Sequence, residues 1–464
     1  MKPMNLIEIE KAVSGSLVQG EPRARVSGVS IDSRTVKEGE LFIAIIGERF
    51  DGHSFITEAV KKGARALIVD REIETKSGVG IIRVNDTTVA LQDLARYYRH
   101  KFAELKVIAI TGSAGKTTTK DMISTLLGRK FKIRKTPGNL NNYYGLPLTL
   151  LGLEGDEDIA VLEMGMSRLG EIRLLAGIAG PEIGVITNVG PTHLETLGTI
   201  ENVARGKSEL IEALPEEGTA ILNYDDPLVR QMKDSFQGEK VIYYGLTAGA
   251  DLYANSISIS GEEGAISFDL TYWEERLEKL TLNKPGRHNL YNALAAIAVA
   301  REFGVDWPEI REGLKSIALS SLRWDVTRLE NGTIIINDTY NANPLSMRAA
   351  IDATLEIAEG RIITVLGAML ELGAEKENAH LELGRYLRKQ GVNLLITVGE
   401  EGKLIARGAL KEGMPPEEVY NLEDNQAAGR LLLELIRPGD TVLIKGSRGV
   451  KMEEIVELVL KQGD

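Results

Sequence analysis

The chain has 464 residues, more than one hydrophobic core accommodates, so several domains are expected. Its 55 basic and 67 acidic residues give a net charge of −12, which provides no overall attraction for nucleic acid and argues against it as a partner. The absence of cysteine excludes disulfides, thiolate nucleophiles and Cys-ligated zinc.

Residues 1–102 form the first predicted domain, of α/β type. Segment 40–47 has the apolar character of a strand that ends in a turn, 55–63 is typical of a short helix, and 66–69 of a second strand. A helix over 89–104 carries leucines and tyrosines at helical spacing. This helix leads directly into the next apolar run, so we place the domain boundary at its end.

The second predicted domain, 103–318, opens on the most informative segment of the chain. An apolar run over 107–110 stops at a glycine turn, and Gly-Lys-Thr then opens a helix, which is the P-loop arrangement in its shorter T-G-S-x-G-K-T form. Backbone N–H groups and the positive helix end surround phosphate oxygens, Lys116 reaches the β/γ-phosphates, and the Thr117 hydroxyl can ligate Mg²⁺. The alternative is a chance glycine turn between a strand and a helix. The predicted ATP-binding residues here are Thr111, Gly112, Ser113, Ala114, Gly115, Lys116, Thr117 and Thr118.

The rest of this domain predicts a mostly parallel sheet. Buried-type strands recur over 159–162 and 184–187 with helical segments between them, the pattern of parallel strands with crossovers. Short strands over 241–244, 256–259 and 265–268 with turn signals between them predict a small antiparallel patch on its side. An alanine-rich helix over 290–303 follows. Its apolar stretch is too short for a bilayer and the N-terminus has no apolar h-region, so we expect a cytoplasmic protein without a membrane span.

The third predicted domain, 319–464, is Rossmann-like. Four core-type strands over 332–338, 361–367, 394–399 and 441–446 are each followed by turn residues and a helix. Ligands of such sheets bind at the carboxyl ends of the strands. The absence of Gly-x-Gly-x-x-Gly argues against a dinucleotide.

Three charged residues of the central domain are candidate metal or catalytic groups. Glu163 ends one predicted strand and His193 follows another, so both are expected at the edge of the sheet that carries the P-loop. A carboxylate there can hold Mg²⁺ together with Thr117. Taken singly, Glu163 is equally a helix-start carboxylate, His193 a solvated loop histidine, and Lys207 a lysine on a solvated helix face.

Side-chain amides gather in two places in the same domain. Asn289 and Asn292 stand three apart at a helix start, where the first is either an N-cap or, with the second, a pair of groups for an adenine edge. Segment 136–142 is either a plain loop or a donor and acceptor set for a sugar or uracil. In the third domain, Asp338 follows a strand and can accept from ribose hydroxyls.

These segments together resemble the Mur ligase family, the ATP-dependent amino-acid-adding enzymes of peptidoglycan synthesis, over essentially the whole chain. The resemblance is carried by segments 30–34, 39–44, 51–55, 111–118, 138–142, 163–165, 193–195, 288–289, 340–344, 366–373 and 445–448. Segments 139–142, 340–344 and 369–373 are similar to the dipeptide-adding branch, and the Asp-Asn-Pro-Arg segment of the diaminopimelate-adding branch is absent. Leu322 stands where the family usually has glycine before Arg323, and Ala368 where it commonly has an acid.

The resemblance implies roles in phosphate and metal binding. Lys116 and the loop amides would hold the ATP phosphates, and Arg323 the γ-phosphate. Thr117 and Glu163 would bind one Mg²⁺, and Glu163 with His193 a second. Lys207 matches the lysine that family members carry as a CO₂-derived carbamate, which organises metal. The expected catalytic residues are therefore Lys116, His193, Lys207 and Arg323.

It also implies the substrates and their contacts: UDP-N-acetylmuramoyl tripeptide, D-alanyl-D-alanine and ATP. Asn289 and Asn292 would meet adenine, and Asp338 the ribose. The expected contacts of the UDP-sugar, which the first domain would bind, are Ser33, Arg34, Asn139, Asn141 and Asn142. The expected contacts of the amine substrate, which the third domain would bind, are Tyr340, Asn341, Asn343 and His380, the last as a base that deprotonates the amine.

The implied activity is ligation through an acyl phosphate by a monomeric enzyme. Alternatives within the same chemistry are a sister ligase that adds a single amino acid and a ligase of the folylpolyglutamate synthase type. An alternative of another class is a nucleotide-dependent switch, which would hydrolyse ATP slowly and without need of an amine.

Overall fold

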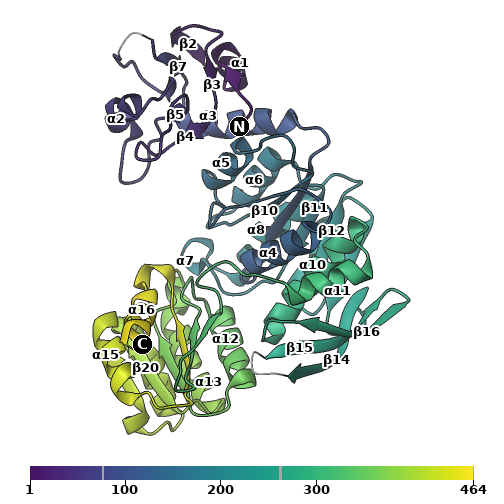
Figure 1. The fold of residues 1–464 in the computed structure, drawn as a ribbon, viewed down its shortest axis with the longest axis vertical. Helices are drawn as coiled ribbons and strands as arrows, with labels where there is room; N and C mark the ends of the chain where they lie inside the picture. Colours follow the sequence, from purple (N-terminus) through teal and green to yellow (C-terminus); the bar gives the residue numbers. More distant parts are fainter. Residues whose placement is uncertain (76–77, 261–263, 463–464) are drawn as a thin grey trace.

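The structure is a computed structural model that describes residues 1–75, 78–260 and 264–462. Three α/β bodies follow one another in chain order, from the N-terminal body through the central body to the C-terminal one (Figure 1). Each contains one larger sheet, so the predicted three-body α/β architecture is confirmed. The boundaries after residues 102 and 318 stay predictions; each larger sheet lies within one of the three segments that they delimit.

The N-terminal body is a five-stranded sheet of order β2-β7-β6-β5-β4 with helices around it. Its strands are β1 (Met4–Asn5), β2 (Ser16–Gln19), β3 (Arg25–Val26), β4 (Val29–Ser30), β5 (Leu41–Ile43), β6 (Ala66–Val69) and β7 (Gly80–Arg83), with β1 and β3 forming a separate pair. Its helices are α1 (Leu6–Ala12), η1 (Gly52–Phe55), α2 (Ile56–Lys61) and α3 (Thr87–His100). The helix expected over 55–63 is thus a 3₁₀ turn followed by α2, with Asp51 as the cap that accepts from the His53 N–H.

The central body has a nine-stranded sheet of order β16-β15-β14-β13-β12-β11-β8-β10-β9. Its strands are β8 (Lys106–Thr111), β9 (Ile133–Lys135), β10 (Ile159–Glu163), β11 (Ile183–Ile186), β12 (Thr219–Asn223), β13 (Lys240–Gly245), β14 (Leu252–Ser260), β15 (Ala265–Tyr272) and β16 (Glu275–Leu282). Its helices are α4 (Lys116–Leu127), α5 (Gly145–Leu151), α6 (Glu171–Ala179), α7 (Leu194–Leu197), α8 (Ile200–Glu212), α9 (Pro227–Arg230), η2 (Gln231–Ser235), α10 (Arg287–Glu302) and α11 (Trp307–Lys315).

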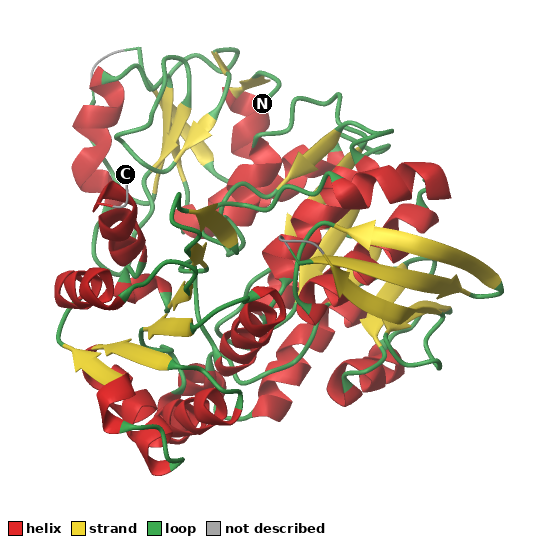
Figure 2. Cartoon of the chain, turned by 60° about the horizontal axis from the view of Figure 1, so that its bottom comes forward, coloured by secondary structure: helices red, strands yellow, loops and turns green. Residues whose placement is uncertain are grey.

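The antiparallel patch has three strands, as predicted, but not the same three: β13 does not belong to it, and β16 was not predicted. Strands β14, β15 and β16 pair antiparallel and project from the side of the central body (Figures 1 and 2). Strand β13, which was assigned to the patch, pairs parallel with β12 on one side and with β14 on the other. Short apolar runs look alike in either setting, so the pattern did not separate a parallel strand from its antiparallel neighbours.

The C-terminal body has a six-stranded sheet of order β17-β18-β22-β19-β20-β21, with only the β17–β18 pair antiparallel among its described strands. Its strands are β17 (Asp325–Arg328), β18 (Ile334–Asn337), β19 (Ile362–Leu366), β20 (Leu394–Val398), β21 (Val419–Leu422) and β22 (Thr441–Lys445). Its helices are α12 (Pro344–Ile357), η3 (Gly373–Glu375), α13 (Lys376–Lys389), α14 (Gly399–Lys411), η4 (Pro416–Glu418), α15 (Asn425–Leu435), η5 (Arg448–Val450) and α16 (Glu453–Gln462).

The four predicted strands of this body are its buried ones, and the two edge strands were missed. β17 and β21 contain no buried residue, so they lack the apolar run by which the others were found. In such a sheet the parallel strands determine which end binds ligands. The prediction of a Rossmann-like domain therefore holds although β17 and β21 were missed.

The alanine-rich helix α10 packs on the P-loop helix α4. Alanines at 293, 295, 296, 298 and 300 are fully buried, and their small side chains allow the two helices to approach closely. This packing brings the first turns of α10 next to the P-loop, at the carboxyl ends of the parallel strands.

Across the part of the chain that the structure describes, no helix has the length and apolar character needed to cross a membrane.

Arg99 ties the N-terminal body to the central one. The side chain is 8% exposed and its three guanidinium nitrogens donate to three carbonyl oxygens, those of Ala179, Phe102 and Leu105. Burial lowers its pKa, so these hydrogen bonds offset the cost of holding a charge there.

We expect Arg99→Met to lower the melting temperature by about 5 °C, because it leaves buried carbonyls without donors, each at a cost of about 1 kcal/mol. Differential scanning calorimetry measures it, with Arg23→Met as the matched control at an exposed position. Equal melting temperatures for the two variants would show that the Arg99 hydrogen bonds contribute nothing net.

Candidate active site

The P-loop lies where β8 ends and α4 begins. Gly112 has φ of 151° and Gly115 has φ of 82°, backbone conformations that residues other than glycine rarely adopt. A Cβ on Gly115 would lie 2.4 Å from Oδ1 of Asn292, so the loop also needs glycine there for the close approach of α10. The predicted turn, helix start and lysine are therefore all present in the order that phosphate binding requires.

The polar groups of the loop are held by the protein itself. Lys116 Nζ donates to the Gly112 carbonyl at 2.7 Å, and the Ala114 N–H donates to Oδ1 of Asn188 at 2.8 Å. Burial lowers the pKa of Lys116, while the negative charge of Glu163 acts in the opposite direction. These hydrogen bonds fix the positions of the lysine and of the loop backbone.

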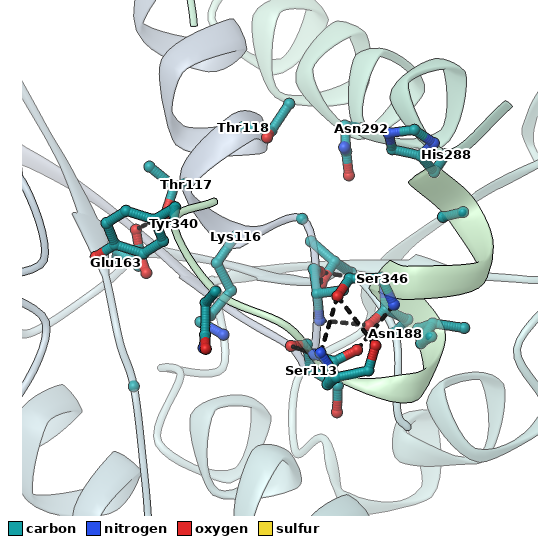
Figure 3. A pocket seen from close by; sticks show the side chains of 18 of the residues that line it. Ser113, Lys116, Thr117, Thr118, Glu163, Asn188, His288, Asn292, Tyr340 and Ser346 are labelled. Atoms are coloured by element: carbon teal, nitrogen blue, oxygen red, sulfur yellow. Dashed lines mark hydrogen bonds between the residues drawn. The ribbon is translucent and has the colours of Figure 1, made fainter. Parts of the chain in front are cut away.

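Thr117 is the meeting point of the central and C-terminal bodies. Its hydroxyl donates to Oε2 of Glu163 at 2.7 Å and accepts from Nη2 of Arg323 at 2.9 Å. The second oxygen of Glu163 accepts from Nδ2 of Asn141 at 2.8 Å. Figure 3 shows Thr117, Glu163, Lys116 and Tyr340 on one side of the cavity, with Asn292 and His288 at the other.

The Thr117–Glu163 pair fits a magnesium ion. A hydroxyl and a carboxylate oxygen at 2.7 Å are hard oxygen donors placed beside the phosphate-binding loop. Within the described residues no group of three or more His, Asp or Glu side chains could hold a metal. A magnesium ion held here would therefore take its remaining ligands from phosphate oxygens and water.

His193 faces the C-terminal body. Its Nδ1 lies 2.5 Å from Oε2 of Glu371, and this hydrogen bond lowers the pKa of the Glu371 carboxyl. Both residues have positive φ, 54° and 64°, so the backbone of each is held in an uncommon conformation. His193 lines the same cavity as Glu163, and its role as a ligand of a second metal stays a prediction.

Lys207 is buried, which excludes the alternative of a solvated helix face. The side chain lies on α8 and is 2% exposed. Burial, and after it the positive charge of Lys116, lowers the pKa of its amine far below the usual value. Lys207 is not among the residues that line the cavity, and its burial favours the neutral form of the amine.

The two asparagines of α10 are placed differently. Asn289 is 2% exposed and its Nδ2 donates to the Pro285 carbonyl at 2.7 Å, so it is not the N-cap, which is Gly286. Asn292 Oδ1 accepts from the Thr119 hydroxyl at 3.2 Å. Both line the cavity, as does Asp338, which pairs with Lys445 at 2.5 Å.

The C-terminal body contributes one wall of the cavity. The Arg323 guanidinium lies 4.0 Å from the centre of the Tyr340 ring. Asn343 caps α12 and its Nδ2 donates to the Ser113 carbonyl of the P-loop at 3.2 Å. The Asn343 side chain thus joins the two bodies at the cavity, and its predicted contact with the amine substrate stays a prediction.

Most of the predicted site residues line one cavity of about 1180 Å³. The predicted residues among its lining are Ser113, Ala114, Gly115, Lys116, Thr117, Thr118, Asn139, Asn141, Asn142, Glu163, His193, Asn289, Asn292, Arg323, Asp338, Tyr340, Asn341 and Asn343.

Some predicted residues lie elsewhere. Thr111 is fully buried in β8, and Gly112 reaches the site through its carbonyl, which accepts from Lys116. Ser33 donates to Oε2 of Glu58 in the N-terminal body, and Arg34 pairs with Asp32 at the surface. The structure does not bring Ser33 and Arg34 to the cavity, and a UDP-sugar contact there stays a prediction.

His380 is not placed to act as a base. Its Nε2 accepts from the Met369 N–H at 2.9 Å and its Nδ1 lies 2.6 Å from the Lys376 carbonyl oxygen, so both ring nitrogens are engaged by the backbone. The side chain is fully buried, and burial lowers its pKa. The imidazole fixes the turn before α13 rather than meeting an amine.

Several cavity residues were given no role from the sequence. They are Asn188, Asp225, His288, Glu371, Lys445 and Arg448. Asn188, Asp225 and Lys445 stand at or just after the ends of β11, β12 and β22. The strand-end rule that singled out Glu163 would have found these three as well.

His288 provides a test of the electrostatics of the cavity. Burial lowers its pKa to about 4, with Asp338 opposing and Lys445 reinforcing the shift. We expect its ring signal to titrate near pH 4 by NMR, assigned by comparison with His288→Gln. Because the unfolded chain takes up this proton near pH 6.5, stability falls as the pH drops from 6.5 toward 4. A midpoint near 6.5 would mean that the ring is solvated.

Family models match each of the three bodies. The Mur ligase family catalytic domain matches residues 25–99, the Mur ligase middle domain residues 110–300, and the Mur ligase glutamate ligase domain residues 322–448.

Individual relatives match over nearly the whole chain. The UDP-N-acetylmuramoyl-tripeptide–D-alanyl-D-alanine ligase of Bacillus subtilis is 39% identical over 97% of this chain and 96% of its own, and that of Escherichia coli is 34% identical over 94% of each. A crystal structure of MurF from Acinetobacter baumannii superposes with a TM-score of 0.91 at 32% identity over 99% of both chains. MurF ligase of Thermotoga maritima in complex with ADP gives a TM-score of 0.83 at 32% identity, covering 94% of this chain and 98% of its own. The chain therefore belongs to the Mur ligase family.

Proposed function

We propose that this chain is an ATP-dependent ligase that joins D-alanyl-D-alanine to UDP-N-acetylmuramoyl tripeptide, releasing ADP and phosphate. The observation that carries the proposal is the single cavity in which three sets of groups face one another. The P-loop supplies donors for phosphates, segment 139–142 supplies amides, and segment 340–343 of the C-terminal body supplies the opposite wall. Three substrates must meet in such a reaction, and the name of the full-length relatives states the same pair of acid and amine.

The first step activates a carboxylate. An oxygen of the terminal carboxylate of the tripeptide attacks the γ-phosphorus of ATP, the bond to the β,γ-bridging oxygen breaks, and ADP leaves. Lys116 and Arg323 neutralise charge on the transferring group, and the fixed N–H groups of the P-loop stabilise it. Both side chains are already within 3 Å of P-loop atoms, Gly112 O and Thr117 Oγ1, so little reorganisation is needed.

The second step forms the amide. The amine of D-alanyl-D-alanine attacks the carbonyl carbon of the acyl phosphate, and the tetrahedral intermediate expels inorganic phosphate. The base that deprotonates the amine is a group other than His380, whose ring nitrogens are engaged. Water must be kept out, because it would hydrolyse the acyl phosphate, and the wall formed by Tyr340 and Asn341 serves this exclusion.

ATP is a substrate of this reaction and Mg²⁺ its companion ion, which supplies charge neutralisation at the phosphates when bound. Thr117 and Glu163 would hold one ion, and Glu163 with His193 a second. Asn289 and Asn292 would meet the adenine, and Asp338 the ribose. The enzyme would act as a monomer in the cytoplasm, with Ser33 and Arg34 contacting the UDP-sugar in the N-terminal body.

The proposal predicts amide formation and oxygen transfer. Supplied with ATP, Mg²⁺, D-alanyl-D-alanine and a tripeptide labelled with ¹⁸O in its terminal carboxylate, the enzyme should form pentapeptide and release phosphate that contains ¹⁸O. We expect Lys116→Ala to reduce the rate of ligation at least 100-fold, because the negative charge on the transferring phosphoryl group loses the positive charge of the lysine. Mass spectrometry of the nucleotide product and of the phosphate measures both.

The controls separate this ligase from its alternatives. Lys130→Ala, an exposed lysine just beyond the end of α4, should keep the wild-type rate. Glycine, glutamate or lysine in place of the dipeptide should give no amide. ADP release without any amide would indicate a nucleotide switch, and incorporation of a single amino acid a sister ligase; either result contradicts the proposal.

The burial of Lys207 supports its modification by CO₂. A neutral amine reacts with CO₂ to form a carbamate, and burial disfavours the charged ammonium. We expect Lys207→Ala to lose activity and short carboxylic acids, such as acetate, to restore part of it by placing a carboxylate in the vacated space. Measuring the ligation rate of Lys207→Ala at increasing acetate concentrations checks this recovery. Lys116→Ala is the control variant that acetate should not rescue. No recovery would count against a carbamate.

A further inference from the structure

The linker between α11 and β17 crosses the P-loop helix α4 and is fastened to it. Ser320, in this linker, donates twice to Oδ2 of Asp121 on α4: through its backbone N–H at 3.0 Å and through its hydroxyl at 2.6 Å. Asp121 does not line the cavity, and its side chain is 1% exposed. A buried carboxylate of the P-loop helix thus fixes one point of the linker.

The charge of Asp121 is held in place by two lysines. Nζ of Lys135 donates to its Oδ1 at 2.9 Å, and Nζ of Lys120, also 1% exposed, lies 3.8 Å away. With Oδ1 engaged by lysine and Oδ2 by the linker, both carboxylate oxygens have partners. Hydrogen bonds to an ionised acceptor are stronger than those between neutral groups, so this is a firm attachment.

Arg323, three residues further along the linker, is fastened to the same helix face. Its Nη2 donates to the hydroxyl of Thr117 at 2.9 Å. Thr117 and Asp121 are four residues apart on α4, so they lie one above the other on one face, about 6 Å apart. The span from Ser320 to Arg323 therefore runs along one turn of the P-loop helix.

The backbone around Arg323 needs such anchors. Leu322 has φ of 62° and Trp324 has φ of 55°, a left-handed conformation that is unfavourable for large side chains. Hydrogen bonds hold the C-terminal side of the segment: the Leu322 N–H donates to Oδ2 of Asp325 and the Tyr340 N–H to the Leu322 carbonyl. On the side of the central body, the linker before Leu322 is held by the hydrogen bonds of Ser320 to Asp121.

We propose that Asp121, through Ser320, is a positioning residue for Arg323: it sets the register of the linker so that the guanidinium reaches the P-loop hydroxyl and the transferring phosphate beyond it. This inference rests on the proposed function for the role of Arg323 in catalysis. Asp121 itself touches no substrate. Its loss should therefore lower the rate of phosphoryl transfer without weakening the binding of ATP, whose contacts with the P-loop remain.

The kinetic test uses Asp121→Asn and Ser320→Ala, each alone and combined with Arg323→Ala. We expect Ser320→Ala to lower kcat roughly fivefold and Asp121→Asn roughly tenfold or more, with the KM for ATP within about twofold of wild type. In the Arg323→Ala background neither should lower kcat further, because the residue that they position is gone. Ser316→Ala, in the same linker but bonded only to the Gly313 carbonyl in the described structure, is the matched control with an unchanged rate.

Two kinetic outcomes would overturn the proposal. One is the same fold loss in both backgrounds, which would mean that Asp121 and Arg323 act independently. The other is a raised KM with unchanged kcat, which would assign Asp121 to nucleotide binding. Ser320→Ala keeps the test valid if Asp121→Asn does not fold, because it leaves the buried side chains of Asp121 and Lys120 and the contact of Asp121 with Lys135 in place. If the wild-type enzyme forms the amide but the kcat losses of the single variants simply add in the double variants, this inference is contradicted and the proposed function is not.

A second measurement does not depend on ligation. Trp324 is 6% exposed and follows Arg323, so its fluorescence reports on the linker. In a Trp273→Phe, Trp307→Phe background, we expect acrylamide to quench Trp324 at least twofold more strongly in Ser320→Ala and Asp121→Asn than in Ser316→Ala. Equal quenching in all three would show that the linker keeps its position without Asp121, which contradicts the proposal whatever the enzyme catalyses.

Discussion

The hydroxyl of Thr117 is the contact on which the arrangement of the site depends. It donates to Glu163 at the end of β10 and accepts from Arg323 in the linker that leads to the C-terminal body. One oxygen thus joins the P-loop, a neighbouring strand and a residue more than 200 positions away in the chain. A residue without a hydroxyl at this place would leave the Glu163 oxygen and the Arg323 nitrogen without this partner, and unpartnered buried groups of this kind are costly.

The polar groups of the P-loop and of Glu163 are held by hydrogen bonds within the protein. Lys116 donates to Gly112, Asn188 engages both polar groups of Ala114, and Asn141 holds the far oxygen of Glu163. These contacts give the loop and its lysine defined positions, so the residues proposed to hold phosphate are placed by the protein itself.

The sequence was sufficient where the chemistry is local or follows from strand ends. The P-loop needs only a strand, a turn and a helix in order, and Glu163 needs only the rule that parallel strands end at one edge. The burial of Lys207 and His380 could not be read in this way, because helical spacing does not say which polar residue faces a core. The bridge from Asn343 to the Ser113 carbonyl was equally out of reach, since it depends on how two bodies are placed against each other.

The same limit applies to the fold: the edge strands and the pairing direction of β13 could not be predicted from the sequence. β17 and β21 carry no buried residue, and β13 differs from its antiparallel neighbours only in its direction of pairing. Pairing direction depends on the path of the connecting chain and on the partner strand. A run of four or five apolar residues carries no information about either.

Contacts across the boundary between the central and C-terminal bodies involve residues of the cavity, among them Arg323 to Thr117, Asn343 to Ser113, and Glu371 to His193. If the C-terminal body moved away, the P-loop would lose two partners and the histidine its carboxylate at the same time. The cavity residues therefore have all of these partners only when the C-terminal body lies against the central body. Such coupling suits the proposed reaction, whose activated acid must be protected from water, because the groups proposed to stabilise the transferring phosphate would be brought together with the wall proposed to exclude solvent.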